Sequence, residues 1–286
     1  MAFFLRGGVQ RSGSVVDVTG VAVAEHVVAS VVGVGVGARL DRAGVEWLWR
    51  RLREAFPDAW SCVLMPTHVH LLVASGLAAR LGYVLRGYTR RYGTRLHVAP
   101  PQPTNTAAIA QRTLRYQWLN PVRARLVDDP WQWRWSTLRD VGGVAWPVWT
   151  PLSRVAALAQ LAPERLLARC LPEVAALLEP SRAMVVSDEG LRGAVQSVLR
   201  EVGGDACRSS VGRQLYVQAS YRIGHPHPRR LADALGCGLR TIHRMRRPPH
   251  VALETVVRTL ADPRTHGGPL GTLRPRALGC LGPAWR

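Results

Sequence analysis

The sequence predicts an α+β domain followed by an all-α region. Up to about residue 140, the spacing of apolar residues alternates between strand and helix patterns in the order strand, helix, strand, strand, helix, helix. From about residue 150 the chain is rich in leucine and alanine, and its periodicity is helical. The first pattern favours a small antiparallel sheet with helices on one face.

The first strand and helix are marked by glycines and by a helix cap. Residues 25–40 have a strand pattern, and glycines at 33, 35 and 37 interrupt it. A phosphate-binding loop would need a helix start directly after them, so a bulged or closely approached strand is the better interpretation. Asp41 is a natural N-cap. It precedes a helix with an apolar stripe at Val45, Leu48, Leu52 and Phe56.

Further elements follow up to residue 140. We expect strands over 61–65 and 68–73, a helix over 76–97 and a proline-rich loop over 98–106. The next helix is expected to run to about Asn120, where Asn120 and Pro121 would cap and begin a second short helix. Beyond it, alternate tryptophans favour a core segment, with base stacking as the alternative; they are Trp131, Trp133 and Trp135.

The length of 286 residues favours more than one compact unit. The α+β domain is expected over 1–147, a helical connector over 148–222 and a helix-turn-helix over 223–262. The remaining segment, 263–286, is rich in glycine, proline and arginine, and we expect it to be disordered.

The net charge of +19 predicts a polyanionic partner. All 38 basic residues are arginine. Nucleic acid is the favoured partner, and a membrane surface is the alternative. On the helix expected over 76–97, arginines recur near helical spacing and predict a DNA-binding face; they are Arg86, Arg90, Arg91 and Arg95.

No targeting or redox feature stands out in the sequence. No apolar run approaches the length of about 18 residues that a membrane span needs, and the apolar start is too short for a signal peptide. Five scattered cysteines without a CxxC pair argue against a disulfide framework and a thiolate zinc site. We expect a cytoplasmic, nucleoid-associated protein with no membrane partner.

A metal site is suggested by the stretch LMPTHVHLLV, residues 64–73. Successive strand residues alternate faces, so His68 and His70 would point the same way. Two neutral imidazoles at this spacing can bind one divalent ion. The alternative is a pair of histidines on the solvated face of a half-buried strand.

A tyrosine and an amide on one helix face strengthen the metal hypothesis. Tyr116 stands four residues before Asn120, so the two side chains would share a face. The amide oxygen of Asn120 is a candidate third ligand, with simple helix capping as the alternative. The phenol of Tyr116 is a candidate nucleophile. Tyr88 and Tyr92 are the other candidates, for which DNA backbone contact or helix packing is the favoured role.

These motifs together resemble those of a known family. The stretch MPTHVHLLV, followed by RYQWLNPVRARLV and WRWST, is similar to the REP-associated tyrosine transposases of the single-tyrosine HUH superfamily, over about residues 25–140. The resemblance implies a ferredoxin-like HUH catalytic domain. It implies that His68, His70 and Asn120 hold Mg²⁺ or Mn²⁺. It also implies that Tyr116 attacks a DNA phosphate to form a 5′-phosphotyrosine bond and a free 3′-OH.

The sequence departs from the family pattern in three places. The family's GHLFQGRFKS-like stretch is reduced here to TRLHVAPPQPTNTAAIAQR, Trp118 stands two residues after the tyrosine, and the first strand is EHVVASVVGVG. The expected function is cleavage and rejoining of single-stranded or hairpin DNA. The alternative is a domesticated, catalytically weakened regulator that binds DNA. A third hypothesis is a metal hydrolase that uses His68, His70 and water.

A helix-turn-helix is predicted by RRLADALGCGLRTIHRMRR, residues 229–247. Gly236 supplies the turn, and apolar residues on both sides would pack the two helices together. The second helix would present five side chains to a duplex, namely Arg240, Thr241, His243, Arg244 and Arg247. A plain helical hairpin with a solvated basic face is the alternative. We therefore expect duplex DNA at this region, and a monomer or homodimer.

Overall fold

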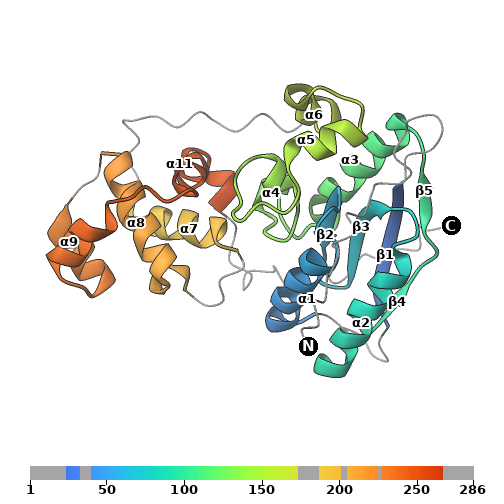
Figure 1. Ribbon diagram of the computed structural model, residues 1–286, viewed down its shortest axis with the longest axis horizontal. Coiled ribbons are helices and arrows are strands. Elements are labelled where there is room, and N and C mark those ends of the chain that lie inside the picture. The colour runs from blue at the N-terminus through green and yellow to red at the C-terminus, as the bar shows by residue number, and fades with distance from the viewer. Residues whose placement is uncertain (1–23, 33–39, 173–186, 201–204, 225–226, 267–286) are drawn as a thin grey trace, which may run out of the picture.

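A computed structural model of the protein describes residues 24–32, 40–172, 187–200, 205–224 and 227–266. Figure 1 shows two lobes, one built around a sheet and the other made of helices. The glycines at 33, 35 and 37, which we expected inside a bulged strand, lie outside the described residues. Among the described helices, none has both the length and the apolar character needed to span a bilayer.

The sheet lobe contains one five-stranded sheet in which every pairing is antiparallel. The strand order is β2-β3-β1-β4, and β5 also pairs with β1. The strands are β1 (Ala24–Val32), β2 (Ser61–Leu64), β3 (His68–Ala74), β4 (Arg95–Val98) and β5 (Gln102–Thr104). The predicted combination of α-helices with a small antiparallel sheet is confirmed.

Strands β4 and β5 occupy chain that we expected to be the end of a helix and a loop. Helix α2 (Ala78–Tyr92) ends earlier than predicted because Gly93 adopts a left-handed backbone with φ of 72° and its N–H bonds the carbonyl of Thr89. The chain after Gly93 then returns along β1. Pairing along β1 supplies backbone hydrogen bonds that the spacing of side chains does not reveal.

Helix α1 (Arg42–Ala55) begins as predicted, since the Asp41 carboxylate accepts a hydrogen bond from the Gly44 N–H at 2.6 Å. Helix α3 differs from the prediction. It runs without a break from Ala107 to Arg123, and Asn120 is therefore inside the helix and not an N-cap. Pro121 removes one N–H near the helix end, while the Asn120 carbonyl still accepts from the Ala124 N–H.

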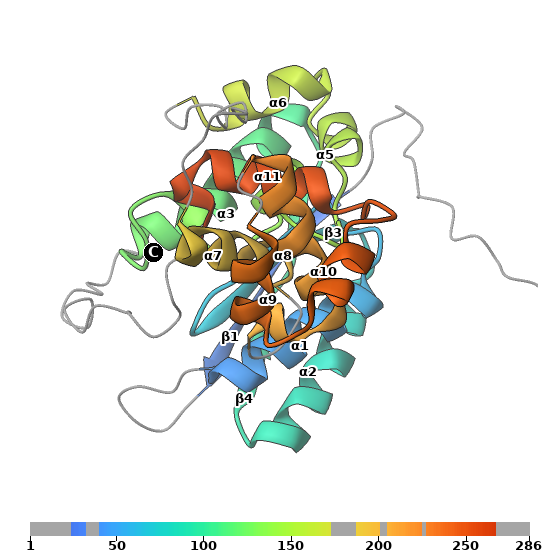
Figure 2. The same ribbon diagram turned by 90° about the vertical axis from the view of Figure 1, so that its left-hand side faces the viewer.

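Helices lie on both faces of the sheet, and the prediction that they lie on one face was wrong. Figures 1 and 2 place α1 and α2 on one side of the sheet and α3 on the other. Side chains of α3 contact the face that carries His70, as described below. The other face carries Val69, Leu71 and Val73, which are also buried. Both faces of β3 therefore carry buried side chains, and helices cover each of them.

The remaining helices belong to two separate hydrophobic clusters. The first cluster includes residues up to Leu171, and the second begins at Leu191. The sheet lobe also contains η1 (Pro130–Gln132), α4 (Leu138–Val141), α5 (Leu152–Leu158) and α6 (Pro163–Cys170). The helical lobe contains α7 (Asp188–Val198), η2 (Ala206–Arg208), α8 (Ser210–Arg222), α9 (Pro228–Leu235), α10 (Leu239–Met245), α11 (Leu253–Ala261) and η3 (Pro263–His266).

This division splits the segment 148–222, which we expected to be one connector. Helices α5 and α6 complete the sheet lobe, whereas α7 and α8 form the base on which α9, α10 and α11 pack. The segment 263–286, expected to be disordered, starts with η3, where Thr265 is fully buried. Residues 267–286 lie outside the described residues.

The three alternate tryptophans belong to the core of the sheet lobe, in agreement with the favoured interpretation. Trp131, Trp133 and Trp135 are all buried. The indole N–H of Trp133 donates to the carbonyl of Leu64 at 3.0 Å. The Leu64 N–H in turn donates to the carbonyl of Trp135 at 2.9 Å. The tryptophan segment therefore anchors the end of β2, directly before the turn that leads to His68.

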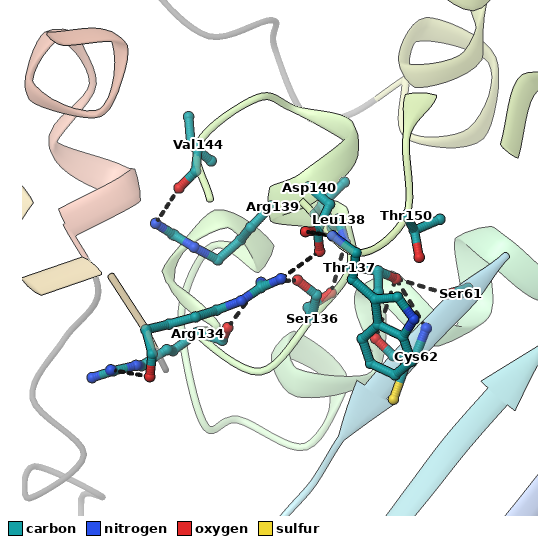
Figure 3. A network of polar contacts seen from close by, with 12 residues as sticks. Ser61, Cys62, Arg134, Ser136, Thr137, Leu138, Arg139, Asp140, Val144 and Thr150 are labelled. Carbon is teal, nitrogen blue, oxygen red and sulfur yellow. Dashed lines mark hydrogen bonds and ion pairs between the residues drawn. The ribbon is translucent and has the colours of Figure 1, made fainter. Parts of the chain in front are cut away.

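Two fully buried arginines, Arg139 and Arg200, join the lobes. Figure 3 shows Arg139 and Asp140 within the network of polar contacts at this boundary. Arg200, at the end of the α7 segment, pairs with Asp140 of α4 at 2.5 Å and donates to the carbonyl of Ser136 at 3.0 Å. Its guanidinium also lies 4.6 Å from the ring centre of Trp49. Arg139 reaches the other way and donates to the hydroxyl of Ser197 at 2.6 Å. These charge-assisted bonds cross the boundary between the two clusters.

Replacing Arg200 by leucine should destabilise the protein strongly. The substitution leaves the Asp140 carboxylate buried without its charged partner, which typically costs about 3–5 kcal/mol. Urea unfolding followed by tryptophan fluorescence measures the loss. The matched control is Arg222→Leu, because Arg222 forms an exposed pair with Glu254 and such pairs contribute about 0–1 kcal/mol. Equal losses in the two variants would contradict this account.

Candidate functional site

Three histidines project from one face of the sheet. His68 and His70 lie on β3, where their positions pair with Ser30 and Val28 of β1. His26 of β1 pairs with Leu72, so the alternation of strand residues places it on the same face. His26 is 8% exposed and His70 is 3% exposed. The face therefore carries a cluster of imidazoles that the protein itself covers.

Helix α3 covers this cluster with Asn120. The amide Nδ2 of Asn120 contacts Nε2 of His70 and lies 3.5 Å from Nε2 of His68. An amide nitrogen carries two hydrogens, so it can donate one to each imidazole. The two Nε2 atoms and one amide group therefore converge on a single point, and each ring presents the same nitrogen to it.

The opposite nitrogens of the two rings have partners of their own. Nδ1 of His68 lies 2.9 Å from the hydroxyl of Thr67. Nδ1 of His70 lies 3.1 Å from Nε2 of His26. If both Nε2 atoms accept hydrogens from Asn120, each Nδ1 must carry the proton and donate it outward. One consistent set of hydrogen bonds thus fixes both rings.

Burial keeps these imidazoles neutral at pH 7. Loss of solvent lowers the pKa of His68, lowers that of His70 to about 2 and lowers that of His26 to about 4. The neighbouring histidines lower the pKa of His70 further. Because a metal ligand must be the neutral imidazole, the rings are already in the protonation state that ligation needs.

Tyr116 lies beside the histidines. Its ring centre is 5.6 Å from that of His70 and 6.3 Å from that of His26. Burial raises the pKa of the Tyr116 phenol, and the Arg123 guanidinium, 5.3 Å from the ring centre, partly opposes the rise. At neutral pH the phenol is protonated, so a reaction at its oxygen needs activation.

The two alternative tyrosines lie elsewhere. Tyr88 is 1% exposed, and burial raises the pKa of its phenol to about 12. The hydroxyl of Tyr92 donates to the carbonyl of Ala43 at 3.3 Å. Both residues belong to α2, on the other side of the sheet from α3. Of these three tyrosines, the structure brings Tyr116 to the histidines.

The predicted basic face is divided between the two sides of the sheet. Arg86, Arg90 and Arg91 are exposed on α2, away from Tyr116. Arg95 is exposed on β4, where it pairs with Val32. By strand alternation this position shares the face of the histidines. Three of the four arginines are therefore not part of the site around Tyr116.

Helices α9 and α10 carry the other predicted DNA-binding residues. Gly236 joins the helices with a left-handed backbone of φ 59°, and Leu231 and Ile242 are buried between them and their neighbours. Thr241 is half-buried. The other four predicted side chains are exposed, on α10 or directly after it; they are Arg240, His243, Arg244 and Arg247.

Three residues of the site were not predicted from the sequence. Thr67 and His26 hold the two imidazoles, and Arg123 lies over the ring of Tyr116. Arg123 follows Tyr116 by seven residues, a spacing that returns to the same helix face and could have revealed it. His26 could not be assigned, because its partner depends on the register between β1 and β3.

Comparisons of the chain with protein-family models, curated proteins and solved structures found no match. Among the described residues, no group of three or more histidine, cysteine, aspartate and glutamate side chains is arranged to hold a metal ion. The set that converges here contains two imidazoles and an amide, and the amide belongs to a residue outside those four types.

Proposed function

We propose that this protein cleaves and rejoins single-stranded or hairpin DNA through a tyrosine nucleophile, with the help of a divalent metal. The observation that carries the proposal is the meeting of Tyr116 and Asn120 with His68 and His70. The two pairs come from α3 and β3, about 50 positions apart in the chain. The resemblance to REP-associated tyrosine transposases assigns roles to the same four residues.

The donor set fits Mg²⁺ or Mn²⁺. His68 and His70 would hold the ion through Nε2. Asn120 would hold it through its amide oxygen, an atom type that hard divalent ions accept, after the amide turns over to bring that oxygen to the place where Nδ2 meets the imidazoles. The fit rests on the convergence of both Nε2 atoms on one amide and on the neutral state of both rings. When bound, such an ion polarises a phosphoryl oxygen and stabilises negative charge on it.

The chain's own residues supply the rest of the chemistry. The Tyr116 oxygen attacks phosphorus, the bond from phosphorus to the 3′ oxygen breaks, the phenol loses its proton and the 3′ oxygen gains one. The products are a 5′-phosphotyrosine and a 3′-OH, so attack by a 3′-OH rejoins the strand in the reverse sequence. Arg123 favours the ionised phenol, since a nearby cation stabilises a phenolate.

The wider surface fits a nucleic-acid partner. The charge of +19 attracts phosphate groups, and α10 exposes basic side chains far along the chain from Tyr116. We assign α9 and α10 to a helix-turn-helix that holds duplex DNA, and the sheet lobe to a ferredoxin-like catalytic domain. The protein would act as a monomer or homodimer. Because its substrate would be DNA, it would be associated with the nucleoid.

A DNA-binding regulator is the second candidate. The exposed basic side chains of α10 belong to the helical lobe, which has its own hydrophobic cluster. DNA binding by this lobe would not depend on Tyr116. A chain whose catalytic activity has weakened could therefore keep this DNA binding and act as a regulator at its DNA target.

Tyr116→Phe should abolish a covalent protein–DNA adduct. The substitution removes only the phenol oxygen, so noncovalent DNA binding should remain. The protein is incubated with a labelled hairpin-bearing single strand and Mn²⁺, and the adduct is measured on a denaturing gel. Tyr92→Phe is the matched control and should keep the adduct. An adduct that survives in Tyr116→Phe moves the nucleophile elsewhere, whereas tight duplex binding without any adduct favours the regulator.

The double variant Arg240→Gln, Arg244→Gln should weaken duplex binding. The slope of log binding constant against log salt concentration is negative, and each exposed arginine that meets a phosphate adds about 0.9 to its magnitude. We expect this magnitude to fall by about 2 when both arginines are removed. Fluorescence anisotropy over a salt series measures it. The same double change at Arg86 and Arg90 tests whether α2 also contacts DNA. An unchanged slope in the α10 variant would refute the assignment of duplex binding to α10.

A further inference from the structure

We propose that His26 is a positioning residue for the metal site. In this role Nε2 of His26 accepts a hydrogen bond from the Nδ1–H of His70. The Nε2 lone pair of His70 then points toward the position shared with His68 and Asn120. The inference rests on the metal-dependent function proposed above. It concerns a residue that neither the HxH motif nor the Tyr116–Asn120 spacing includes.

The hydrogen bonds around His70 carry the argument. Nε2 of His26 lies 3.1 Å from Nδ1 of His70. The other nitrogen of His70, Nε2, contacts the amide nitrogen of Asn120, which can only donate. A neutral imidazole has one donor and one acceptor, so Nδ1 of His70 must be the donor and Nε2 of His26 the acceptor. By accepting this hydrogen bond, His26 stabilises the tautomer in which the Nε2 lone pair of His70 points toward Asn120 and His68.

The position of His26 suits support of a ligand better than ligation. Its Nε2 is bonded to Nδ1 of His70, the ring nitrogen that does not contact Asn120. Its ring centre lies 5.3 Å from that of His70 with an angle of 28° between the planes, so the two rings meet edge to edge and are close to coplanar, as an N–H···N hydrogen bond between imidazoles requires. His26 is 8% exposed, and water is therefore a poor substitute as the acceptor.

Thr67 plays the equivalent part for His68. Its hydroxyl lies 2.9 Å from Nδ1 of His68, while Nε2 of His68 faces Asn120. In both rings, therefore, Nδ1 bonds a supporting side chain and Nε2 faces Asn120. Partners of this kind fix the ring orientation and the tautomer of metal-binding histidines, and their loss typically costs 10–100-fold in metal affinity.

The experiment measures Mn²⁺ binding to the full chain by electron paramagnetic resonance of the free ion. His26→Leu removes the acceptor and should weaken binding about 10–100-fold. His26→Gln keeps an acceptor on a side chain of similar reach and should recover most of the affinity. His227→Leu removes an exposed imidazole from the helical lobe, directly before α9, and should leave binding unchanged. Unchanged affinity in His26→Leu, or equal losses in all three variants, would overturn the positioning role.

A second measurement needs neither a variant at His26 nor a metal. Two-bond ¹H–¹⁵N spectra of the ¹⁵N-histidine-labelled, metal-free protein distinguish the two neutral tautomers. We expect His70, assigned by comparison with His70→Asn, to carry its proton on Nδ1. A proton on Nε2 would overturn the inference even if His26→Leu failed to fold. Absence of Mn²⁺ binding by the unmodified protein would instead refute the metal-dependent function, and the spectra would still decide the tautomer.

Discussion

The structure around the site depends on one interaction, the contact of the Asn120 amide with Nε2 of two imidazoles. Asn120 belongs to α3, and the imidazoles belong to β3 at the middle of the sheet. This contact orients α3 over the histidine-bearing face and brings Tyr116 beside His70. If α3 were rotated by one residue, about 100°, neither side chain would face the sheet. The relative positions of the four side chains therefore depend on how α3 packs against β3.

The rest of the sheet lobe holds that strand in place. Trp133 and Trp135 bond the backbone of Leu64 at the end of β2, just before the turn into β3. The same segment leads into α4, where Arg139 and Asp140 meet the helical lobe. The tryptophans, the buried arginines and the histidine strand thus form one continuous block. A rigid support of this kind is what a site made of converging side chains requires.

The basic surfaces of the protein are spread over different parts of the fold. The arginines of α2 lie on the side of the sheet away from Tyr116, Arg123 lies over Tyr116 itself, and α10 belongs to the helical lobe. A single duplex lying flat on one face would not meet all three surfaces. Under the proposed function, the catalytic site and the duplex-binding helix would therefore engage different parts of a folded DNA substrate.

The sequence by itself determined the α+β class, the cap at Asp41, the burial of the tryptophans and the placement of His68 and His70 on the same face of one strand. These features depend on short-range periodicity and capping chemistry, which neighbouring residues decide. Tertiary structure decided that α3 runs through Asn120, that β4 and β5 exist, and that helices cover both faces. It also decided that His26 supports His70, because strand register and helix docking depend on contacts between residues far apart in the chain.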